Sequence, residues 1–513
     1  MSKLDLEKKL ETYFGYSSFR QGQKEIIEDI LNRQDVMGVL PTGSGKSICY
    51  QLPALLQEGL TVVVSPLISL MMDQVKQLKA LNIKNVVAIN SFMEPKQRKK
   101  IWNELHRYQL IYISPELLQR PNLQRKLNQV GVRLFVVDEA HCISQWGHEF
   151  RPDYLKLKEI ISSLGDPTVL ALSATVTEIV QRDILTFLNR PNMTKHLYPI
   201  DKPNIAFCVE HMSGDKEKQE RIVSLLNSYS VPTIIYFSSR LEAENISALL
   251  SSQTNRRVAF YHGGMESHDR IIIQQQFMNG QLDAICCTSA FGMGINKKNV
   301  RLVIHYHLTP QIEAYIQEVG RAGRDNKACV SLLLFSEGDV YLPRNIIKGE
   351  LPTKGEISSV FNHLKGMVEE NISLPSSNQE NVLLFQLTES KWRFLRYQLE
   401  KHGVLTEENE ILYSDKKWKE AYHAICKKCE ERFLIKDKQL KEVMEWVYHT
   451  GGCLRKKLYQ DFQQTFTPAK EQCCTNCGFS WENWKPEQLE QTRESQYSWE
   501  EKLKKLLLVE QLS

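Results

Sequence analysis

The chain has 513 residues, with 65 Lys and Arg against 61 Asp and Glu, which gives a formal net charge of +4. At about 100–200 residues per domain, this length predicts roughly three to four domains. Apolar residues make up 42% of the chain and charged residues 25%, a globular composition that excludes a wholly disordered protein. With a net charge so close to zero, any surface that binds nucleic acid must be a local basic groove.

The sequence shows neither a membrane span nor a secretion signal. No apolar run approaches the roughly 18 residues that cross a bilayer. The segment Met1–Asp5 lacks the basic and then apolar pattern of a signal peptide. We therefore expect a cytoplasmic protein with no membrane partner. In that reducing compartment, clustered cysteines predict a metal site before disulfides.

Short β-rich segments alternate with segments of helix length through the first two-fifths of the chain. The predicted strands are Val36–Leu40, Thr61–Val64, Leu110–Ile113, Leu134–Val137 and Val169–Leu172. Continuous apolar strands of this kind are typical of a parallel sheet buried on both faces. The pattern restarts at Thr233–Phe237, Val258–Tyr261, Ala284–Cys287, Leu302–His305 and Ser331–Phe335. The sequence therefore predicts two consecutive α/β domains, residues 1–200 and 201–340, with a seam near Pro199–Pro203.

After residue 340 the strand pattern fades and the chain becomes mostly helical. Thr388 is a candidate helix cap, and the short β-like segment Glu410–Tyr413 follows it, as in a winged helix. We therefore predict a winged-helix-like module over residues 341–420. Residues 421–485 are predicted as a helical platform that holds clustered cysteines, and residues 486–513 as a polar tail with a short helix.

A glycine-rich segment follows the first predicted strand and precedes a helical segment. Its residues are Pro41, Thr42, Gly43, Ser44, Gly45, Lys46 and Ser47. The glycines let backbone N–H groups face phosphate oxygens, Lys46 supplies positive charge, and the Ser47 hydroxyl can ligate Mg2+. The strict motif has glycine five positions before Gly45, where this chain has Leu40, so this is a relaxed form of the phosphate loop.

An acidic pair, Asp138 and Glu139, directly follows the apolar strand Leu134–Val137. A carboxylate at the end of a buried strand that faces a phosphate loop is placed to hold Mg2+, and Asp138 fits that role. Glu139 beside it can orient and deprotonate an attacking water. An isolated Asp-Glu pair is usually a solvated surface pair, but the buried strand and the phosphate loop argue against that interpretation here.

With these motifs in order, the sequence resembles the helicases of superfamily two, and more narrowly the RecQ family in its short bacterial form. Phe19–Gln23 resembles the family's adenine-reading motif. The resemblance implies that Gln23 reads the adenine, that Tyr16 stacks on it and that Arg20 belongs to the same ATP site. It also implies two tandem RecA-like domains with parallel sheets, then a mostly helical region with winged-helix-like and zinc-binding parts.

Strand-end loops of the first domain match family motifs that contact nucleic acid. Ser65–Leu70 and Ser114–Glu116 match loops that touch the nucleic-acid backbone, with Ser65 and Pro66 as contact residues. Ser173–Thr175 matches the motif that links ATP hydrolysis to strand movement. The resemblance therefore implies that one face of the first domain carries a DNA strand.

The segment His141–Tyr154 resembles the aromatic-rich loop of the RecQ family almost residue for residue. Trp146 and Phe150 offer stacking faces to unpaired bases, and His148 and Arg151 add polar and cationic contacts. The alternative is that the two aromatic side chains lie in a core. A loop this rich in polar and glycine residues makes a poor core segment, so we expect it to be exposed and to bind DNA.

The second α/β domain completes the resemblance. Its matching motifs are Tyr236–Arg240, Tyr261–Met265, Thr288–Asn296 and Gln317–Arg324. In the last motif, two guanidinium groups three positions apart on one helix face can reach across a cleft to developing phosphate charge. The resemblance assigns Arg324 as the arginine finger and Arg321 as its neighbour on the nucleotide. Gln317 belongs to the same predicted site.

Half of the twelve cysteines lie in the last fifth of the chain. Four thiolates fit a tetrahedral zinc site, and Cys474 and Cys477 have the spacing of a zinc knuckle. The RecQ zinc platform has a helix that ends in Cys-Arg and a later group that ends in Cys-x-x-Cys. That resemblance implies the zinc ligands Cys453, Cys473, Cys474 and Cys477.

Two departures from the family pattern leave the fourth zinc ligand open. Leu454 stands where the family has arginine, and Cys473 directly precedes another predicted ligand. His449, or the separate pair Cys426 and Cys429, could substitute. Reduced cysteines without metal are a further alternative.

The resemblance implies an ATP-dependent DNA helicase that moves three-prime to five-prime along one strand, in DNA repair and recombination. The implied cofactors are ATP, Mg2+ held by Ser47 and Asp138, and Zn2+. The implied partners are single-stranded and branched or duplex DNA, a single-stranded-DNA-binding protein and other repair factors, and the expected location is the cytoplasm at the nucleoid.

Two alternatives for the function stay open at this point. One is an RNA-remodelling helicase of the same superfamily, which would have to read ribose hydroxyls. The other is a DNA-binding scaffold with an inactive motor. The aromatic-rich loop argues against RNA, and intact Lys46, Glu139 and Arg324 argue against the scaffold.

Overall fold

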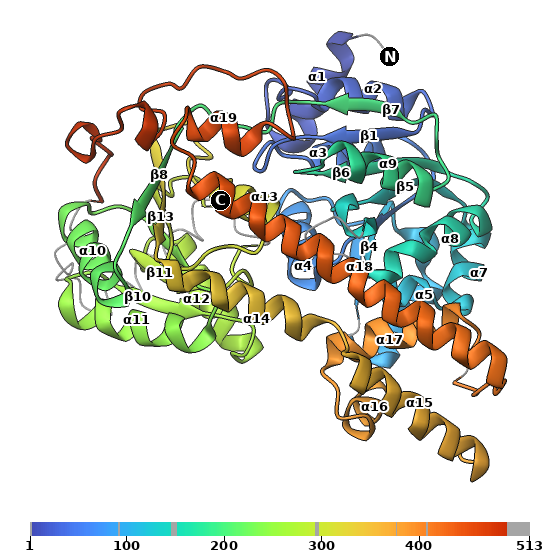
Figure 1. Cartoon of the computed structure of the whole chain (residues 1–513). Helices are drawn as coiled ribbons and strands as arrows, with labels where there is room; N and C mark the ends of the chain where they lie inside the picture. Colours follow the sequence, from blue (N-terminus) through green and yellow to red (C-terminus); the bar gives the residue numbers. More distant parts are fainter. Residues whose placement is uncertain are drawn as a thin grey trace, which may run out of the picture.

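The computed structural model describes residues 3–90, 93–144, 151–292, 297–375, 377–406 and 409–489 (Figure 1). Some predictions concern residues outside these ranges. They are the contacts of Trp146, His148 and Phe150 in the aromatic-rich loop, the segment 293–296 of the fourth motif of the second domain, and the short helix at the end of the tail.

The first domain is built on a seven-stranded sheet in which every neighbouring pair of strands is parallel, in the order β3-β4-β2-β5-β6-β1-β7. The strands are β1 (Val36–Val39), β2 (Leu60–Val64), β3 (Val86–Ile89), β4 (Leu110–Ile113), β5 (Val132–Val137), β6 (Thr168–Ser173) and β7 (Thr194–Leu197). The helices are α1 (Lys3–Phe14), α2 (Gln23–Leu31), α3 (Ile48–Leu56), α4 (Ile68–Ala80), α5 (Pro95–Asn103), α6 (Pro115–Leu118), α7 (Pro121–Val130), α8 (Leu157–Ser163) and α9 (Glu178–Phe187), with short 3-10 turns η1 (Leu105–Arg107), η2 (Ala140–Ile143) and η3 (Pro152–Lys156).

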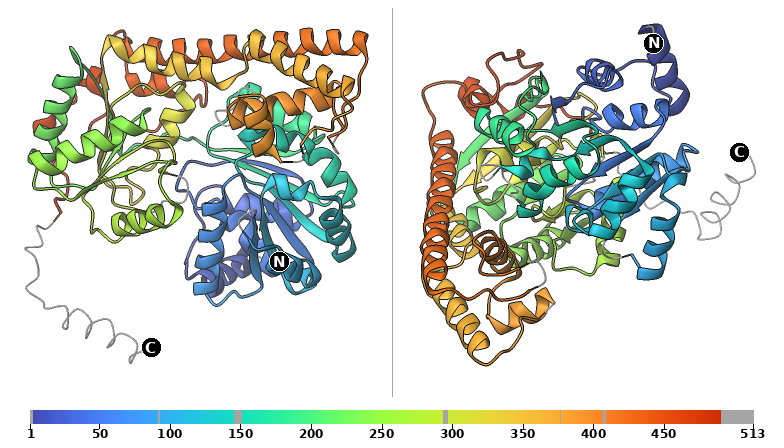
Figure 2. Two further views of the ribbon diagram at one scale, coloured as in Figure 1. Left: turned by 90° about the horizontal axis from the view of Figure 1, so that it is seen from below. Right: turned by 90° about the vertical axis from the view of Figure 1, so that its right-hand side faces the viewer.

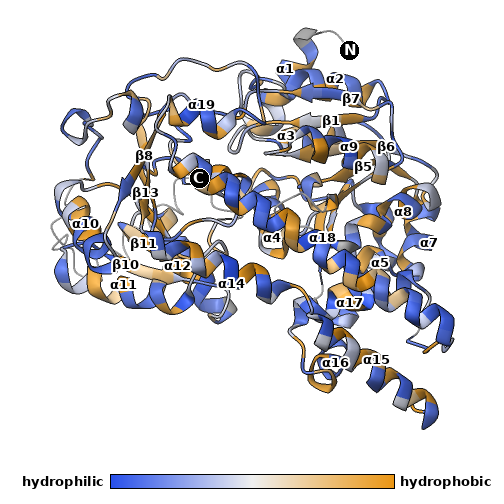
Figure 3. Cartoon of the chain, viewed as in Figure 1, coloured by the Kyte–Doolittle hydropathy of each residue, from blue (hydrophilic) through white to orange (hydrophobic). Residues whose placement is uncertain are grey.

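Helices cover both faces of this sheet, which explains why its strands are apolar throughout. Along β2, Val62 and Val64 belong to one hydrophobic core, and Val63 between them belongs to the core on the opposite face. Successive side chains of a strand point to opposite faces, so a strand covered on both sides loses the alternation of polar and apolar residues. Figure 3 shows the strands as mostly hydrophobic and the surrounding helices as mixed.

The second domain repeats the design with a six-stranded parallel sheet in the order β10-β11-β9-β12-β13-β8. Its strands are β8 (Ile205–His211), β9 (Thr233–Tyr236), β10 (Val258–Tyr261), β11 (Ala284–Cys287), β12 (Leu302–His305) and β13 (Cys329–Phe335). Its helices are α10 (Asp215–Ser228), α11 (Arg240–Gln253), α12 (Ser267–Met278) and α13 (Ile312–Val319), followed by the 3-10 turn η4 (Glu337–Val340). The prediction of two parallel α/β domains is confirmed.

Three strands that the sequence pattern does not predict lie at sheet edges: β3 and β7 in the first sheet and β8 in the second. Two of them, β3 (VVAI) and β8 (IAFCVEH), are mostly buried, so only β7 lacks an apolar pattern. In β7 the four residues Thr, Lys, His and Leu alternate between half-buried and exposed.

The C-terminal region is mainly helical, as predicted. Its elements are α14 (Tyr341–Glu350), α15 (Lys354–Glu369), α16 (Asn378–Leu384), α17 (Glu389–Lys401), α18 (Asp415–Val447) and α19 (Leu454–Tyr459), with the 3-10 turns η5 (Thr475–Cys477) and η6 (Trp481–Asn483). The predicted cap Thr388 accepts a hydrogen bond from the N–H of Lys391. The predicted β-like segment contributes one antiparallel bridge, between Leu405 and Ile411.

Helices α15, α16 and α17 and the first part of α18 enclose a hydrophobic core of their own, with Trp392 at its centre. The order of three helices, a short β-bridge and a further helix is compatible with the predicted winged-helix-like module. Helix α18 has 33 residues, so the predicted boundary at residues 420 and 421 falls inside it. The helical module and the cysteine platform therefore share one continuous helix.

Helix α18 returns the chain from the helical module to the second domain, where it contacts α13 and α14 (Figure 2). Its Trp446 ring lies 4.7 Å from the ring of Tyr315 on α13. At the other end, Glu400 of α17 lies 3.7 Å from Lys156 of the first domain. The C-terminal region thus contacts both α/β domains. Among the described residues, no helix is long and apolar enough to cross a membrane.

Candidate active site

The predicted phosphate loop connects the end of β1 to the start of α3. Gly43 and Gly45 have φ angles of 84° and 78°, a region that side chains disfavour. A side chain at residue 45 would also bring its Cβ to 2.9 Å from the Gln23 amide nitrogen. The Ser44 hydroxyl is buried and has no hydrogen-bond partner among the described residues. Such an unpaired polar atom inside a strand-to-helix loop fits a loop that binds a phosphate group.

The predicted adenine motif lies directly behind this loop. The Gln23 amide donates to the carbonyls of Ser44 and Gly45, at 2.9 Å each, and accepts from the N–H of Arg20. Arg20 in turn donates to the carbonyl of Gly43 at 2.5 Å. In this structure the two residues therefore support the backbone of the phosphate loop. Their contact with adenine, and that of Tyr16, whose side chain is 54% exposed, stay predictions.

The acidic pair lies at the end of β5, as predicted. Asp138 is 7% exposed, and burial together with the charge of Glu139 raises its pKa to about 7, while Lys46 acts in the opposite direction. The hydroxyl of Tyr154 donates to the Asp138 carbonyl at 3.1 Å and fixes the turn. A buried carboxylate beside a second acidic group is stabilised by a bound cation, so this donor set fits Mg2+.

A polar chain connects the acidic pair to the predicted coupling motif. Glu139, in the left-handed backbone region with φ 49°, places its carboxylate 3.4 Å from Nδ1 of the buried His141. The same nitrogen lies 2.9 Å from the hydroxyl of Ser173. The Thr175 hydroxyl nearby is buried without a partner among the described residues. The end of β6 is therefore connected through His141 to Glu139, the residue that we expect to activate water.

The second domain closes the site from the opposite side. A Cβ atom built at Gly43 would lie 3.1 Å from Cγ of Arg324, and one built at Gly320 would lie 3.0 Å from Cβ of Thr42. Burial and the charge of Arg321 lower the pKa of Arg324 to about 10. At that pKa Arg324 is still positively charged at neutral pH, and it lies directly beside the phosphate loop.

The expectation that Arg321 and Arg324 share one helix face is wrong. Helix α13 ends at Val319, and both arginines lie in the turns that follow, while Gln317 is half-buried on the helix itself. Arg321 is buried and donates to the carbonyl of Gly292, next to the described end of the Thr288–Asn296 motif. Because the chain leaves the helix after Val319, the two side chains reach different partners.

The strand-end loops that we expect to carry DNA lie at the ends of β2 and β4. The Ser65 hydroxyl is buried without a partner among the described residues, and Pro66 follows it. Arg151, at the described end of the aromatic-rich loop, lies 3.7 Å from Glu116 of the neighbouring strand-end loop. The structure therefore brings the base of the aromatic-rich loop to the predicted DNA face.

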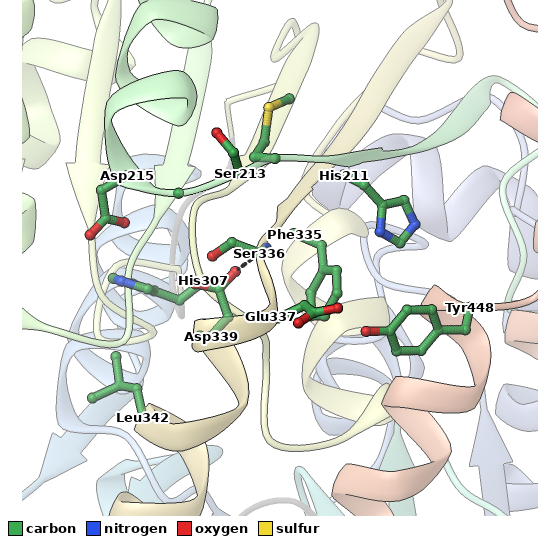
Figure 4. Close-up of a pocket in the computed structure, with 13 residues that line it drawn as sticks. His211, Ser213, Asp215, His307, Phe335, Ser336, Glu337, Asp339, Leu342 and Tyr448 are labelled. Carbon is green, nitrogen blue, oxygen red and sulfur yellow. Dashed lines mark hydrogen bonds between the residues drawn. The ribbon is translucent and has the colours of Figure 1, made fainter.

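A cavity of about 670 Å3 opens at the carboxyl ends of β8, β12 and β13 (Figure 4). His211, Phe335 and Tyr448 form an aromatic wall, and His307 receives a hydrogen bond at Nδ1 from the N–H of Ser238. Burial, with a contribution from Lys218, lowers the pKa of His307 to about 4, so this imidazole is neutral at pH 7. Sequence reasoning missed this cavity because its walls come from separate segments without a shared motif.

The four cysteines predicted as zinc ligands come together. The sulfur atoms of Cys453, Cys473, Cys474 and Cys477 all lie within 4.8 Å of one another, the only such group of metal-binding side chains among the described residues. Tetrahedral zinc with bonds of about 2.3 Å separates its sulfurs by about 3.8 Å, and the Cys453–Cys473 and Cys453–Cys474 separations are 3.5 and 3.9 Å. This donor set therefore fits one zinc ion.

The alternative ligands do not join this group. Cys426 and Cys429 lie on α18, buried in the core of the helical module, where burial raises the pKa of Cys429 to about 12. His449 is not part of the sulfur cluster either. The segment that carries the two adjacent ligands is anchored to the second domain, because Cys474 pairs as a parallel bridge with Phe207 at the edge of the sheet formed by β8.

Comparison with known proteins places these features in a family. The family model "DEAD/DEAH box helicase" matches residues 20–183, and "Helicase conserved C-terminal domain" matches residues 217–326. The chain is 41% identical, over 92% of each chain, to the "Probable ATP-dependent DNA helicase RecS" of Bacillus subtilis (strain 168). The chain belongs to the RecQ family of ATP-dependent DNA helicases.

Other RecQ-family members are longer. The chain is 42% identical to the "ATP-dependent DNA helicase RecQ" of Haemophilus influenzae over 67% of this chain but only 56% of that protein. The Mycobacterium smegmatis helicase Lhr, solved with single-stranded DNA and AMP-PNP, superposes with a TM-score of 0.55 at 18% identity, over 83% of this chain and 55% of that one. This likeness supports the fold of two RecA-like domains.

Proposed function

We propose that this RecQ-family protein couples ATP hydrolysis to three-prime to five-prime movement along single-stranded DNA and thereby unwinds duplex DNA. The observation that carries the proposal is the contact between Arg324 of the second domain and Gly43 of the phosphate loop. A site completed by two domains is sensitive to their separation, so opening and closing can be linked to binding and release of phosphate.

Each residue of the site has a distinct proposed role. Lys46 and the loop N–H groups bind the triphosphate, with Ser47 and Asp138 as the ligands of Mg2+. When bound, Mg2+ supplies charge neutralisation on the phosphate oxygens. Glu139 orients the attacking water and accepts its proton, and Arg324 stabilises the charge that develops on the leaving phosphate. Gln317 and Arg321 keep the arginine turn in place beside these groups.

DNA is the proposed substrate rather than RNA. Two features favour it: the aromatic-rich loop His141–Tyr154, and the names of the relatives, which are DNA helicases. Single-stranded and branched DNA are the proposed forms, in repair and recombination at the nucleoid, with a single-stranded-DNA-binding protein as the proposed protein partner.

The cysteine cluster is proposed to hold one structural zinc ion. All four positions of a tetrahedron are taken by thiolates, so no open position is left for a substrate. The loop around the cluster also pairs with β8 and packs against the second domain through Trp481 and Trp484. Zinc would therefore stabilise the surface by which the platform is attached to the motor.

The test is a steady-state ATPase measurement with no nucleic acid, with single-stranded DNA and with single-stranded RNA of equal length. We expect strong stimulation by DNA only. Strand separation is then measured on duplexes with a three-prime or a five-prime overhang, with Glu139→Gln as the inactive control. Stimulation by RNA alone would favour the RNA-remodelling alternative, and no hydrolysis under any condition would favour the scaffold.

A further inference from the structure

The linker between the two RecA-like domains, residues 199–204, contacts two different parts of the molecule in alternation. Asp201 and the carbonyl of Pro203 face the C-terminal platform, whereas Lys202 and Asn204 face the turn that carries Arg321 and Arg324. The segment is irregular up to Lys202 and then forms a turn at Pro203 and Asn204, closed by the N–H of Ile205 on the carbonyl of Lys202 at 3.2 Å, so one short segment is held from both directions.

On the platform side, the linker is held by buried polar contacts. Arg455 of α19 donates to the Asp201 carboxylate at 2.5 Å, and both side chains are almost completely buried. The Gln463 side-chain oxygen accepts from the N–H groups of Ile200 and Asp201, at 2.8 and 3.1 Å. The N–H of Lys470 donates to Pro203 at 2.8 Å. A buried charge that loses its partner is costly, so these contacts hold the linker to the platform.

On the other side, the linker holds the arginine turn by its carbonyls. The Lys202 ammonium donates to the carbonyls of Gly320 and Ala322, the latter at 3.2 Å. The Asn204 amide donates to Gly323 and Lys327 at 3.0 and 2.8 Å. Both side chains thus bind the backbone on either side of Arg321 and Arg324.

Two details indicate that the contact of Lys202 and Asn204 fixes the position of the arginine turn rather than adding to the stability of the fold. A cation at the carboxyl end of α13 is favourable, but Lys202 stands there beside two arginines, which repel it. Burial and the charges of Arg324 and Arg321 lower the pKa of Lys202 to about 7, although Asp325 and Cys329 partly oppose this. Gly323 has φ 54°, and a Cβ atom there would lie 2.6 Å from the sulfur of Cys329 and clash with Asn204.

We propose that Lys202 is a positioning residue for Arg324, and that the linker transmits the placement of the cysteine platform to the ATP site through the Asp201–Arg455 pair. This inference rests on the proposed role of Arg324 in hydrolysis. Lys202 does not touch the phosphate loop in any contact among the described residues; it acts by fixing the turn from which Arg324 reaches Gly43.

The first test compares Lys202→Met and Lys202→Arg with the matched control Lys195→Met, an exposed lysine on β7. DNA-stimulated hydrolysis is measured as kcat and KM for ATP, together with Tm and single-stranded DNA affinity. A misplaced catalytic group costs roughly 10- to 100-fold in rate, so Lys202→Met should lower kcat by about that factor with little change in KM or Tm. Lys202→Arg should recover part of the rate, and Lys195→Met should match wild type.

A double-mutant comparison decides whether Lys202 acts through Arg324. Arg324→Ala alone and Arg324→Ala with Lys202→Met should have the same kcat, because a residue that positions Arg324 has nothing left to position. The assignment would be overturned if the two substitutions lowered kcat by factors that multiply in the double variant, or if Lys202→Met alone kept the wild-type kcat. If wild-type protein shows no DNA-stimulated hydrolysis, the proposed function fails before this comparison begins, so the two failures are distinct.

The platform half of the proposal is tested by removing both members of the ion pair. The variant Asp201→Asn with Arg455→Met leaves no unpaired buried charge. We expect it to keep its metal content and its DNA affinity but to lose kcat about as Lys202→Met does. A wild-type kcat in this variant would show that the platform does not reach the ATP site through the linker.

Discussion

At the residue scale, the candidate ATP site gathers charged groups from both α/β domains. Lys46 belongs to the phosphate loop, Arg324 approaches the loop from the second domain, and Asp138 and Glu139 lie beside each other at the end of β5. The Ser44 and Thr175 hydroxyls are buried without partners among the described residues. Unpaired buried polar groups of this kind are costly, and they are retained where function requires them.

Lys46→Ala and Glu139→Gln should abolish hydrolysis by different routes. Lys46 binds phosphate, so its loss should weaken ATP binding, by about 10-fold or more. Glu139→Gln should bind ATP as wild type does but reduce kcat by roughly 100-fold or more, because the base is lost. Nucleotide binding by fluorescence and steady-state hydrolysis separate the two effects. Wild-type turnover in Glu139→Gln would show that another group activates the water.

Asp138→Asn should stabilise the nucleotide-free protein and abolish the stabilisation by Mg-ATP. The pKa of Asp138 is raised to about 7, so ionisation in the folded state is unfavourable and the stability of the free protein falls as pH rises toward and through 7. We expect the variant to raise Tm by about 2–4 °C at pH 8 and by less at pH 6. Thermal melts at both pH values, with and without Mg-ATP, check this; an equal Tm gain at both would contradict it.

At the element scale, α18 carries the connection between the helical module, the cysteine platform and the arginine helix. Its last turns place Trp446 against Tyr315 of α13, and the indole N–H donates to the carbonyl of Leu454 at 3.0 Å. The same helix buries Cys426 and Cys429 in the core of the module. One continuous helix thus spans the boundary that the sequence pattern predicts between two domains.

Trp446→Ala should destabilise the protein by about 3–5 kcal/mol, because a fully buried aromatic side chain and its hydrogen bond are both lost. The matched control is Leu434→Ala, on the same helix but 66% exposed, which should change stability by less than about 0.5 kcal/mol. Denaturant unfolding measures both. If the two variants were equally stable, α18 would not depend on its contact with α13.

At the scale of the whole molecule, the C-terminal region joins the two RecA-like domains on one side, while the ATP site joins them on another. The platform contacts the linker through Arg455 and Gln463 and covers the edge of β8 through Cys474. The linker residues 199–204 therefore connect the platform with the arginine turn beside the ATP site.

Metal analysis of the whole protein should give about one zinc per chain. Cys473→Ser should lose it, because its sulfur belongs to the cluster, and Cys426→Ser should keep it, because its thiol lies in a separate core. The Cys473→Ser protein should also bind DNA more weakly, since the platform is organised by metal. Retention of zinc in Cys473→Ser with loss in Cys426→Ser would move the site to α18, and wild-type protein without zinc would refute it.

The sequence by itself determined the strands of the two α/β domains, the phosphate loop and the acidic pair, because each is a local pattern. A buried parallel strand is an apolar run, and a phosphate loop is a set of neighbouring residues with special backbone angles. Edge strands such as β7, with weak burial, leave no such signal. The sequence alone could not choose among Cys473, His449 and Cys426 with Cys429, because spacing does not say which thiols meet.

Only the tertiary structure decided how distant parts meet. It ended α13 at Val319, so that Arg321 turns to Gly292 and Arg324 to the phosphate loop. It placed Gln23 on the backbone of that loop and Cys474 on the edge of β8. It also put Asp201 and Lys202, which carry no motif, between the platform and the arginine turn. Such contacts depend on how the linker is packed between folded bodies, a property that no local pattern of residues encodes.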